Sequence, residues 1–136
     1  MKVVAAAPLS PGRYYVLDGG FSTQLSRYVE GVDQDPLWTA RSLVENKEAV
    51  VRVHRDFLSA GADIILTSSY QASKELLKAE LGLTRAETHR HIVSSAELAW
   101  RAVHETGGCR DTTWWAARSD LTGPVCTMAV STRAAT

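Results

Sequence analysis

A carboxylate followed directly by two glycines is the first feature of the sequence with chemical potential. Asp18 precedes Gly19 and Gly20. The Asp18 carboxylate could accept hydrogen bonds from an ammonium group, and the backbone N–H groups of two residues without side chains could approach a carboxylate closely. Together these groups suit a ligand of the amino-acid type. The alternative is a plain Asp-Gly turn, which is a common connection.

A second polar cluster lies at residues 67–70, in the order Thr-Ser-Ser-Tyr. The hydroxyl groups of Ser69 and Tyr70 could line a polar pocket. Alternatively, Tyr70 is a half-buried aromatic side chain whose hydroxyl reaches solvent. Trp38 follows Pro36 in a polar loop and is either a pocket wall or a lid over the core.

The histidines and cysteines do not form a pattern typical of a metal site. His89 and His91 are two residues apart, so on a helix they point to different faces and cannot chelate one metal ion. His54 is isolated on a helix, where a packed or solvated role is expected. Cys109 and Cys126 have no second cysteine or histidine at the spacing of a zinc knuckle. We therefore expect no metal site from this chain alone, and no residue is assigned a catalytic role.

The elements that must position the two polar clusters form a strand–helix–strand pattern. Residues 14–17 and 63–67 are short apolar runs typical of buried strands, the first of them ending in a tight turn. Residues 46–61 between them have the apolar spacing of a helix. This order predicts a parallel βαβ unit and the α/β class. Because ligands of such folds bind at the carboxyl ends of the strands, residues 18–20 and 67–70 should lie at one edge of the sheet.

The helix expected at residues 46–61 carries its own boundary signals. Asn46 is a good N-cap, and Gly61 provides the stop. Glu48 and Arg52 are four residues apart and are expected to form an ion pair on the helix surface.

Further elements follow the same reasoning. A short helix is expected from about residue 22, a second at 73–81, and a long helix from a capping box at residue 84 to about 105. The two tryptophans at 114–115 could begin another short helix. Residues 121–136 fit neither the helical nor the strand period.

Length and composition exclude several classes of protein. The chain has 136 residues, with 15 Lys plus Arg against 15 Asp plus Glu, so its formal net charge is zero. A neutral chain without a basic stripe is not typical of a nucleic-acid-binding protein. No apolar run approaches the length of a membrane span, and the first nine residues make a poor signal peptide. A cytoplasmic protein is the expectation.

Four segments resemble motifs of the homocysteine S-methyltransferase family. They are VLDGGFSTQL at 16–25, DPLWTA at 35–40, EN at 45–46 with VHRDFLSAGAD at 53–63, and TSSYQAS at 67–73. Their order and spacing make the resemblance specific. It runs from about residue 14 to residue 105, with a fainter match at 110–118. The form of the last motif is similar to that of members that use S-methylmethionine or S-adenosylmethionine, rather than betaine, as methyl donor.

The resemblance implies a zinc-dependent (β/α)₈ TIM barrel that transfers a methyl group from a sulfonium donor to homocysteine, giving methionine. In such an enzyme, zinc binds the homocysteine sulfur as a thiolate. The partners would be homocysteine and the sulfonium donor, with no nucleic acid and no membrane. The substrate-binding residues implied by position are Asp18, Gly19, Gly20, Trp38, Ser69 and Tyr70.

The chain also departs from the family pattern. The family's three zinc-binding cysteines occur later, in Gly-x-Asn-Cys and Gly-Gly-Cys-Cys contexts, and the segment at 107–110 lacks the second cysteine. Residues 121–127 differ from the expected third-strand segment, Ser-Val-Gly-Pro-Tyr-Gly. We therefore expect a leader at 1–13, a partial homocysteine-binding barrel at 14–120, truncated around its third strand, and an aberrant tail at 121–136.

A partial barrel has consequences for activity and association. Without the zinc ligands, the truncated chain is expected to be inactive. Its unpaired strand edges are expected to promote self-association. The alternative function is a non-catalytic binding or assembly module.

Overall fold

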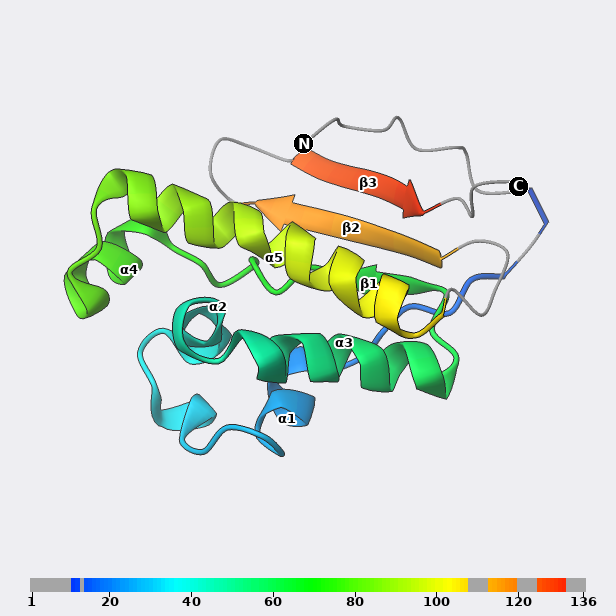
Figure 1. Cartoon of the computed structure of the whole chain (residues 1–136), viewed down its shortest axis with the longest axis horizontal. Helices are drawn as coiled ribbons and strands as arrows, with labels where there is room; N and C mark the ends of the chain where they lie inside the picture. The colour runs from blue at the N-terminus through cyan, green and yellow to red at the C-terminus, as the bar shows by residue number, and fades with distance from the viewer. Residues whose placement is uncertain (1–10, 13, 108–112, 120–124, 132–136) are drawn as a thin grey trace.

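A computed structural model describes residues 11–12, 14–107, 113–119 and 125–131, the last two segments through their backbone only. In chain order, the helices and strands are α1 (Phe21–Leu25), 3₁₀ segments at Val32–Gln34 and Trp38–Arg41, α2 (Ser42–Glu45), α3 (Lys47–Ala60), β1 (Ile64–Leu66), α4 (Lys74–Leu81), α5 (Arg85–Glu105), β2 (Thr113–Ser119) and β3 (Val125–Ser131). Figure 1 shows the chain as a mixed α/β structure that is rich in helix.

The strands form one sheet in the order β1-β2-β3. β1 and β2 are parallel, with Ile64 opposite Trp114, whereas β2 and β3 are antiparallel. Leu17 forms an isolated parallel bridge with Ile64. The predicted parallel relation between the segment before α1 and β1 is therefore confirmed. The antiparallel neighbour β3 is not an arrangement that the all-parallel pattern predicted.

The prediction of a buried strand and tight turn at the start of the chain is wrong in two respects. Tyr14, Val16 and Leu17 are 97%, 57% and 52% exposed, because among the described residues no element covers their side chains. The backbone after them does not turn tightly. It stays extended at Gly20, which has φ −66° and ψ 97° and directly precedes α1.

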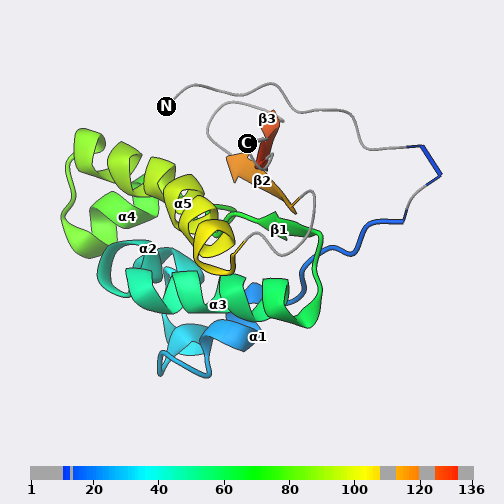
Figure 2. The same cartoon turned by 45° about the vertical axis from the view of Figure 1, so that its right-hand side comes forward.

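The two long helices lie side by side against the sheet, and α3 lies between α5 and α1 (Figures 1 and 2). The predicted capping box of α5 is present, since Thr84 and Glu87 bond each other's backbone N–H groups. Gly61 ends α3 with φ 109°, a left-handed conformation that glycine adopts without strain. Asn46 precedes α3, but its side chain makes no capping hydrogen bond.

The ion pair expected within α3 is replaced by one between helices. Glu48 accepts two hydrogen bonds from Arg101 of α5, at 2.6 and 2.7 Å. The Arg52 guanidinium instead lies 4.3 Å from the centre of the Tyr28 ring. Local spacing alone does not predict this choice, because the partner of Glu48 lies 53 residues away.

The core lies on both faces of α3. A larger cluster joins α1, α2, α3 and α4 through Leu25, Leu43, Val50, Val53 and Leu77, among others. A smaller cluster surrounds Ile65 of β1, which is fully buried against residues of α5, including Ala96, Ala99 and Val103. The short strand β1 is therefore anchored to the helices by a single central side chain.

The expectation of a helix at Trp114–Trp115 is also wrong, because both residues lie in β2. Residues of the expected tail form β3. The segment with the two tryptophans is a strand because it pairs with β1, which lies far away in the sequence. None of the helices in the described part of the chain combines the length and apolarity needed to span a membrane.

This packing predicts that Ile65 contributes more to stability than its neighbour on the strand. Ile65→Ala should lower the free energy of unfolding by about 2–5 kcal/mol, because it leaves a cavity between β1 and α5. Leu66, which is 39% exposed, is the matched control, and Leu66→Ala should cost much less. Urea denaturation of both variants measures the difference. Equal losses would contradict the assignment of Ile65 to the core.

Candidate functional site

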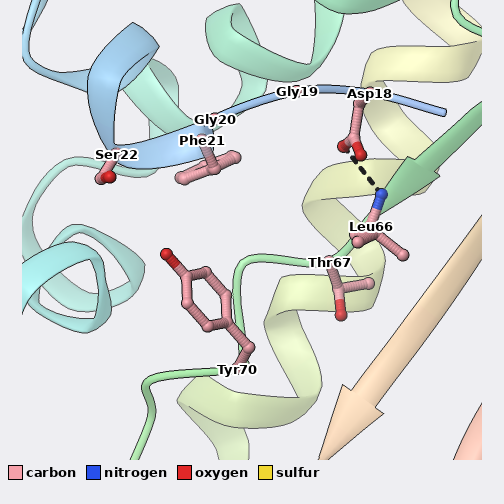
Figure 3. A pocket seen from close by; sticks show the side chains of 8 residues that line it. All are labelled: Asp18, Gly19, Gly20, Phe21, Ser22, Leu66, Thr67 and Tyr70. Atoms are coloured by element: carbon pink, nitrogen blue, oxygen red, sulfur yellow. Dashed lines mark hydrogen bonds between the residues drawn. The ribbon is translucent and has the colours of Figure 1, made fainter.

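A pocket of about 240 Å³ opens where the segment before α1 meets the end of β1. Its lining residues are Asp18, Gly19, Gly20, Phe21, Ser22, Leu66, Thr67 and Tyr70. Val16 and Asp18 join the two chain segments by hydrogen bonds, and Asp18 makes two of them. The Asp18 N–H donates to the Ile64 carbonyl at 2.9 Å, and the Leu66 N–H donates to Asp18 Oδ2 at 2.9 Å (Figure 3). The two polar clusters of the sequence therefore meet at one edge of the sheet, as predicted.

The Asp18 carboxyl group has unusual electrostatics. Burial raises the pKa of Asp18 from 3.8 to about 6, and the hydrogen bond from the Leu66 N–H offsets only part of that effect. The side chain is partly buried, and no described cation forms an ion pair with it. The carboxylate is therefore a strong acceptor that would gain from a cationic hydrogen-bond donor.

The space available for a side chain differs between Gly19 and Gly20. A Cβ at position 19 would lie 3.1 Å from Phe57 Cε1, a tight contact, so a larger residue would require the Phe57 ring of α3 to shift by a few tenths of an ångström. A Cβ at Gly20 would meet only the Thr23 side chain at 3.4 Å or more. Among the described residues, no acceptor bonds the N–H groups of Gly19 and Gly20. Two backbone donors thus remain available beside Asp18.

Tyr70 and Ser69 have different relations to the pocket. The Tyr70 side chain is partly buried and projects into the space between the two chain segments, with its hydroxyl directed toward α1 (Figure 3). Ser69 is only 4% exposed and does not line the pocket. Its hydroxyl lies 2.9 Å from the hydroxyl of Thr67. Ser69 therefore supports the pocket wall from behind.

Trp38 does not line the pocket and is 45% exposed. Its φ is 49°, a left-handed conformation that costs a bulky residue about 1–3 kcal/mol. Asp35 holds the backbone before it, accepting from the Leu37 N–H at 2.8 Å and from Arg41. Burial alone would raise the pKa of Asp35, but the bonds from Arg41 and the Leu37 N–H outweigh it and lower that pKa. The bonds to Asp35 thus hold the backbone next to Trp38, which has a strained conformation.

Sequence reasoning missed part of the pocket lining. Phe21, Ser22 and Leu66 line it, although none carried a chemical signal in the sequence. Phe21 and Ser22 directly follow the two glycines, and Leu66 directly precedes the polar cluster. The sequence signal that could have identified these lining residues is therefore their adjacency to the predicted strand ends.

The described residues contain no group of three or more His, Cys, Asp or Glu side chains that could hold a metal ion. Cys109 lies outside the described residues, and only the backbone of Cys126 is described. His54 is fully buried beside the ring of Phe21, at 5.1 Å between centroids. Burial lowers the pKa of His54 to about 4, as expected for a packed neutral imidazole. Of the packed and solvated roles left open for His54, the structure shows the packed one.

The raised pKa of Asp18 predicts a specific pH dependence of stability. Asn at position 18 keeps an acceptor for the Leu66 N–H but carries no charge. The charge of Asp18 costs stability only above its unfolded pKa of 3.8, and the cost is complete above about pH 6. Asp18→Asn should therefore gain stability relative to the wild type as pH rises from 4 to 6, with a constant difference above that range.

Urea denaturation at several pH values tests this expectation. Asp35→Asn is the matched control with the opposite sign, because the pKa of Asp35 is lowered and its contribution is lost as pH falls. A difference between Asp18→Asn and the wild type that does not change with pH would contradict the assignment.

The family model for homocysteine S-methyltransferase matches residues 15–131. A betaine-homocysteine S-methyltransferase of Drosophila melanogaster is 51% identical over 88 residues, which are 64% of this chain and 27% of that relative. Homocysteine S-methyltransferase 1 of Arabidopsis thaliana is 43% identical over 100 residues, covering 68% of this chain and 30% of that relative.

A solved structure is similar as well. The crystal structure of the homocysteine methyltransferase MmuM from Escherichia coli, in its metallated form, aligns with a TM-score of 0.66 and 35% identity. The alignment covers 78% of this chain and 38% of that one. The chain thus spans about a third or less of the curated relatives that it matches. Motifs, family model and structure agree, and the chain belongs to the homocysteine S-methyltransferase family.

Proposed function

We propose that this chain carries the amino-acid-binding part of a homocysteine S-methyltransferase. The observation that carries the proposal is that one pocket pairs the Asp18 carboxylate with the N–H groups of Gly19 and Gly20, which bond no acceptor among the described residues. An amino acid presents an ammonium group and a carboxylate on one carbon atom. A carboxylate acceptor beside two backbone donors complements both charges.

The electrostatics of Asp18 support an ammonium ligand. A carboxylate whose pKa is raised by burial is costly to ionise, and a bound ammonium group would offset that cost. The ligand would therefore bind most tightly above pH 6, where Asp18 is ionised. Gly19 and Gly20 would then hold the ligand carboxylate.

We propose a sulfonium compound, S-methylmethionine or S-adenosylmethionine, as the methyl donor. The support is the similarity of the segment at 67–73 to members that use these donors. The Tyr70 ring in the pocket offers an aromatic face to a cation, and Trp38 and Ser69 would complete or support the donor side of the site. The Drosophila relative is named for betaine, so betaine belongs in every test of the donor.

The reaction itself requires an activated sulfur. The homocysteine thiolate would attack the methyl carbon of the donor, forming a C–S bond while the bond from carbon to the sulfonium sulfur breaks. The donor leaves as a neutral thioether and needs no general acid. The family's zinc would stabilise the thiolate, but the described residues provide no site for it. We therefore propose that this chain by itself binds homocysteine without turnover.

The proposed architecture is the first β/α units of a (β/α)₈ barrel, comprising residues 14–120, preceded by a leader at 1–13 and followed by a tail at 121–136 that contributes β3 to the sheet. The parallel pairing of the segment before α1 with β1, and of β1 with β2, supports this. We also propose a cytoplasmic location and no nucleic-acid partner.

The second candidate function is a non-catalytic binding or assembly module. The exposed apolar side chains of Val16 and Leu17 favour it, because they offer a surface for self-association. A concentration-dependent rise in mass by light scattering, without homocysteine binding, would select this module over the methyltransferase.

Calorimetric titration with homocysteine tests the binding proposal. Asp18→Asn should weaken binding by about 10- to 100-fold at pH 7.5, since a charged hydrogen bond is lost. The ligand control is 4-mercaptobutanoate, which lacks the amino group, and its affinity should not depend on Asp18. Wild-type affinity for homocysteine should fall as pH drops below 6. Equal binding of both ligands by the wild type would contradict the assignment of Asp18.

A methyl-transfer assay tests the proposal about turnover. The chain is incubated with zinc, homocysteine and either S-methylmethionine, S-adenosylmethionine or betaine, and methionine is measured. We expect no methionine above background with any donor. Turnover with a sulfonium donor would overturn the proposal that the chain by itself lacks a zinc site to activate the homocysteine sulfur. Turnover with betaine alone would overturn that proposal and the proposed donor class as well.

A further inference from the structure

One side-chain oxygen joins the loop of Trp38 to the loop of Tyr70. Gln71 Oε1 accepts from the Thr39 hydroxyl at 2.9 Å and from the Thr39 N–H at 3.4 Å. The two residues are 32 positions apart in the sequence. Each is the direct neighbour of one of the two aromatic residues proposed to shape the donor side of the site.

The hydrogen bond between Thr39 and Gln71 is buried at its Thr39 end. Thr39 is fully buried, so its hydroxyl has no access to water and depends on Gln71. The Ala72 N–H donates to the Ser69 carbonyl at 3.0 Å, which keeps the backbone around Gln71 in a turn. The position of the Gln71 side chain is thus set by the segment that also carries Tyr70.

The loop of Trp38 needs support on both sides, since a bulky residue does not keep a φ of 49° by itself. On the N-terminal side, Asp35 accepts from the N–H groups of Leu37 and Trp38 through its side chain and its carbonyl, respectively. On the C-terminal side, the bonds from Thr39 to Gln71 provide the support. This second anchor connects the loop to the segment that carries Tyr70.

We propose that Gln71 and Thr39 are positioning residues, which set the place of Trp38 relative to Tyr70 and so the donor side of the site. The proposal rests on the proposed function for its meaning in donor binding. Neither residue lines the pocket, so both act through their aromatic neighbours.

The test uses the indole N–H signals of the full 136-residue chain in ¹H–¹⁵N spectra. The chain has four tryptophans, and Trp38→Phe identifies the signal of Trp38. Thr39→Val and Gln71→Leu both remove the hydroxyl bond and should shift or broaden that signal. Thr39→Ser keeps a hydroxyl group and should leave it in place. Gln34→Leu, in an exposed position of the preceding segment, is the matched glutamine control and should also leave it in place.

The result overturns the proposal if the Trp38 signal is unchanged in both Thr39→Val and Gln71→Leu, or if Thr39→Ser moves it as far as Thr39→Val does. If the signals of the other three tryptophans also collapse, the variant has unfolded. The spectra of Thr39→Val and Gln71→Leu are then recorded at a lower temperature at which the other three signals are restored, and the same outcomes decide the question.

Binding measurements give the second readout. In the presence of homocysteine, S-methylmethionine should bind about threefold to tenfold more weakly to Thr39→Val and to Gln71→Leu. The double variant should bind no more weakly than Gln71→Leu, because that single variant already removes both bonds from Thr39. Additive losses would overturn the proposal. If the wild type binds no homocysteine, the proposed function fails, while the indole signals still decide whether the two residues position Trp38.

Discussion

The structure depends on the contact between the segment before α1 and the end of β1. Asp18 makes this contact twice, through its backbone N–H to Ile64 and through its carboxylate to the Leu66 N–H. Because the two segments are parallel, both leave the sheet at the same edge, where their carboxyl ends lie. One continuation carries the two glycines, and the other carries the polar cluster that ends in Tyr70. The pocket is the space between them, so Asp18 both helps to join the two segments and lines the pocket.

That double role has an electrostatic cost. The bond from the Leu66 N–H favours the ionised carboxylate, yet burial outweighs it and the pKa of Asp18 rises to about 6. A group that served only to join strands would not need a charge, since an amide oxygen accepts the same bond. The left-handed backbone of Trp38, which the bonds to Asp35 and Gln71 hold, is a second cost. Both costs fall in or beside the pocket, as is common where a site is kept ready for a ligand.

Much of the architecture could be predicted from the sequence where local patterns act alone. The capping box at Thr84, the glycine that ends α3 and the parallel order of the first two strand segments were predicted and are confirmed. The homocysteine S-methyltransferase family was predicted from four motifs and is confirmed by the family model. The tight turn expected after Leu17 is a local prediction that is wrong, and two further wrong predictions concern long-range choices. Glu48 pairs with Arg101 rather than within its own helix, and Trp114 and Trp115 lie in a strand paired with β1.

For the site, the sequence by itself determined which residue types stand at the two strand ends, because each motif is a short run of adjacent residues. It also determined that Asp18, Gly19, Gly20 and Tyr70 would lie together, since parallel strands end at one edge. Only the tertiary structure decided that Ser69 turns its hydroxyl to Thr67 and that Trp38 stands outside the pocket lining. It also decided that Gln71 ties the two loops together. The physical reason is that a side chain's direction and partners depend on atoms brought near by folding, and the spacing of residues along the chain does not contain their positions.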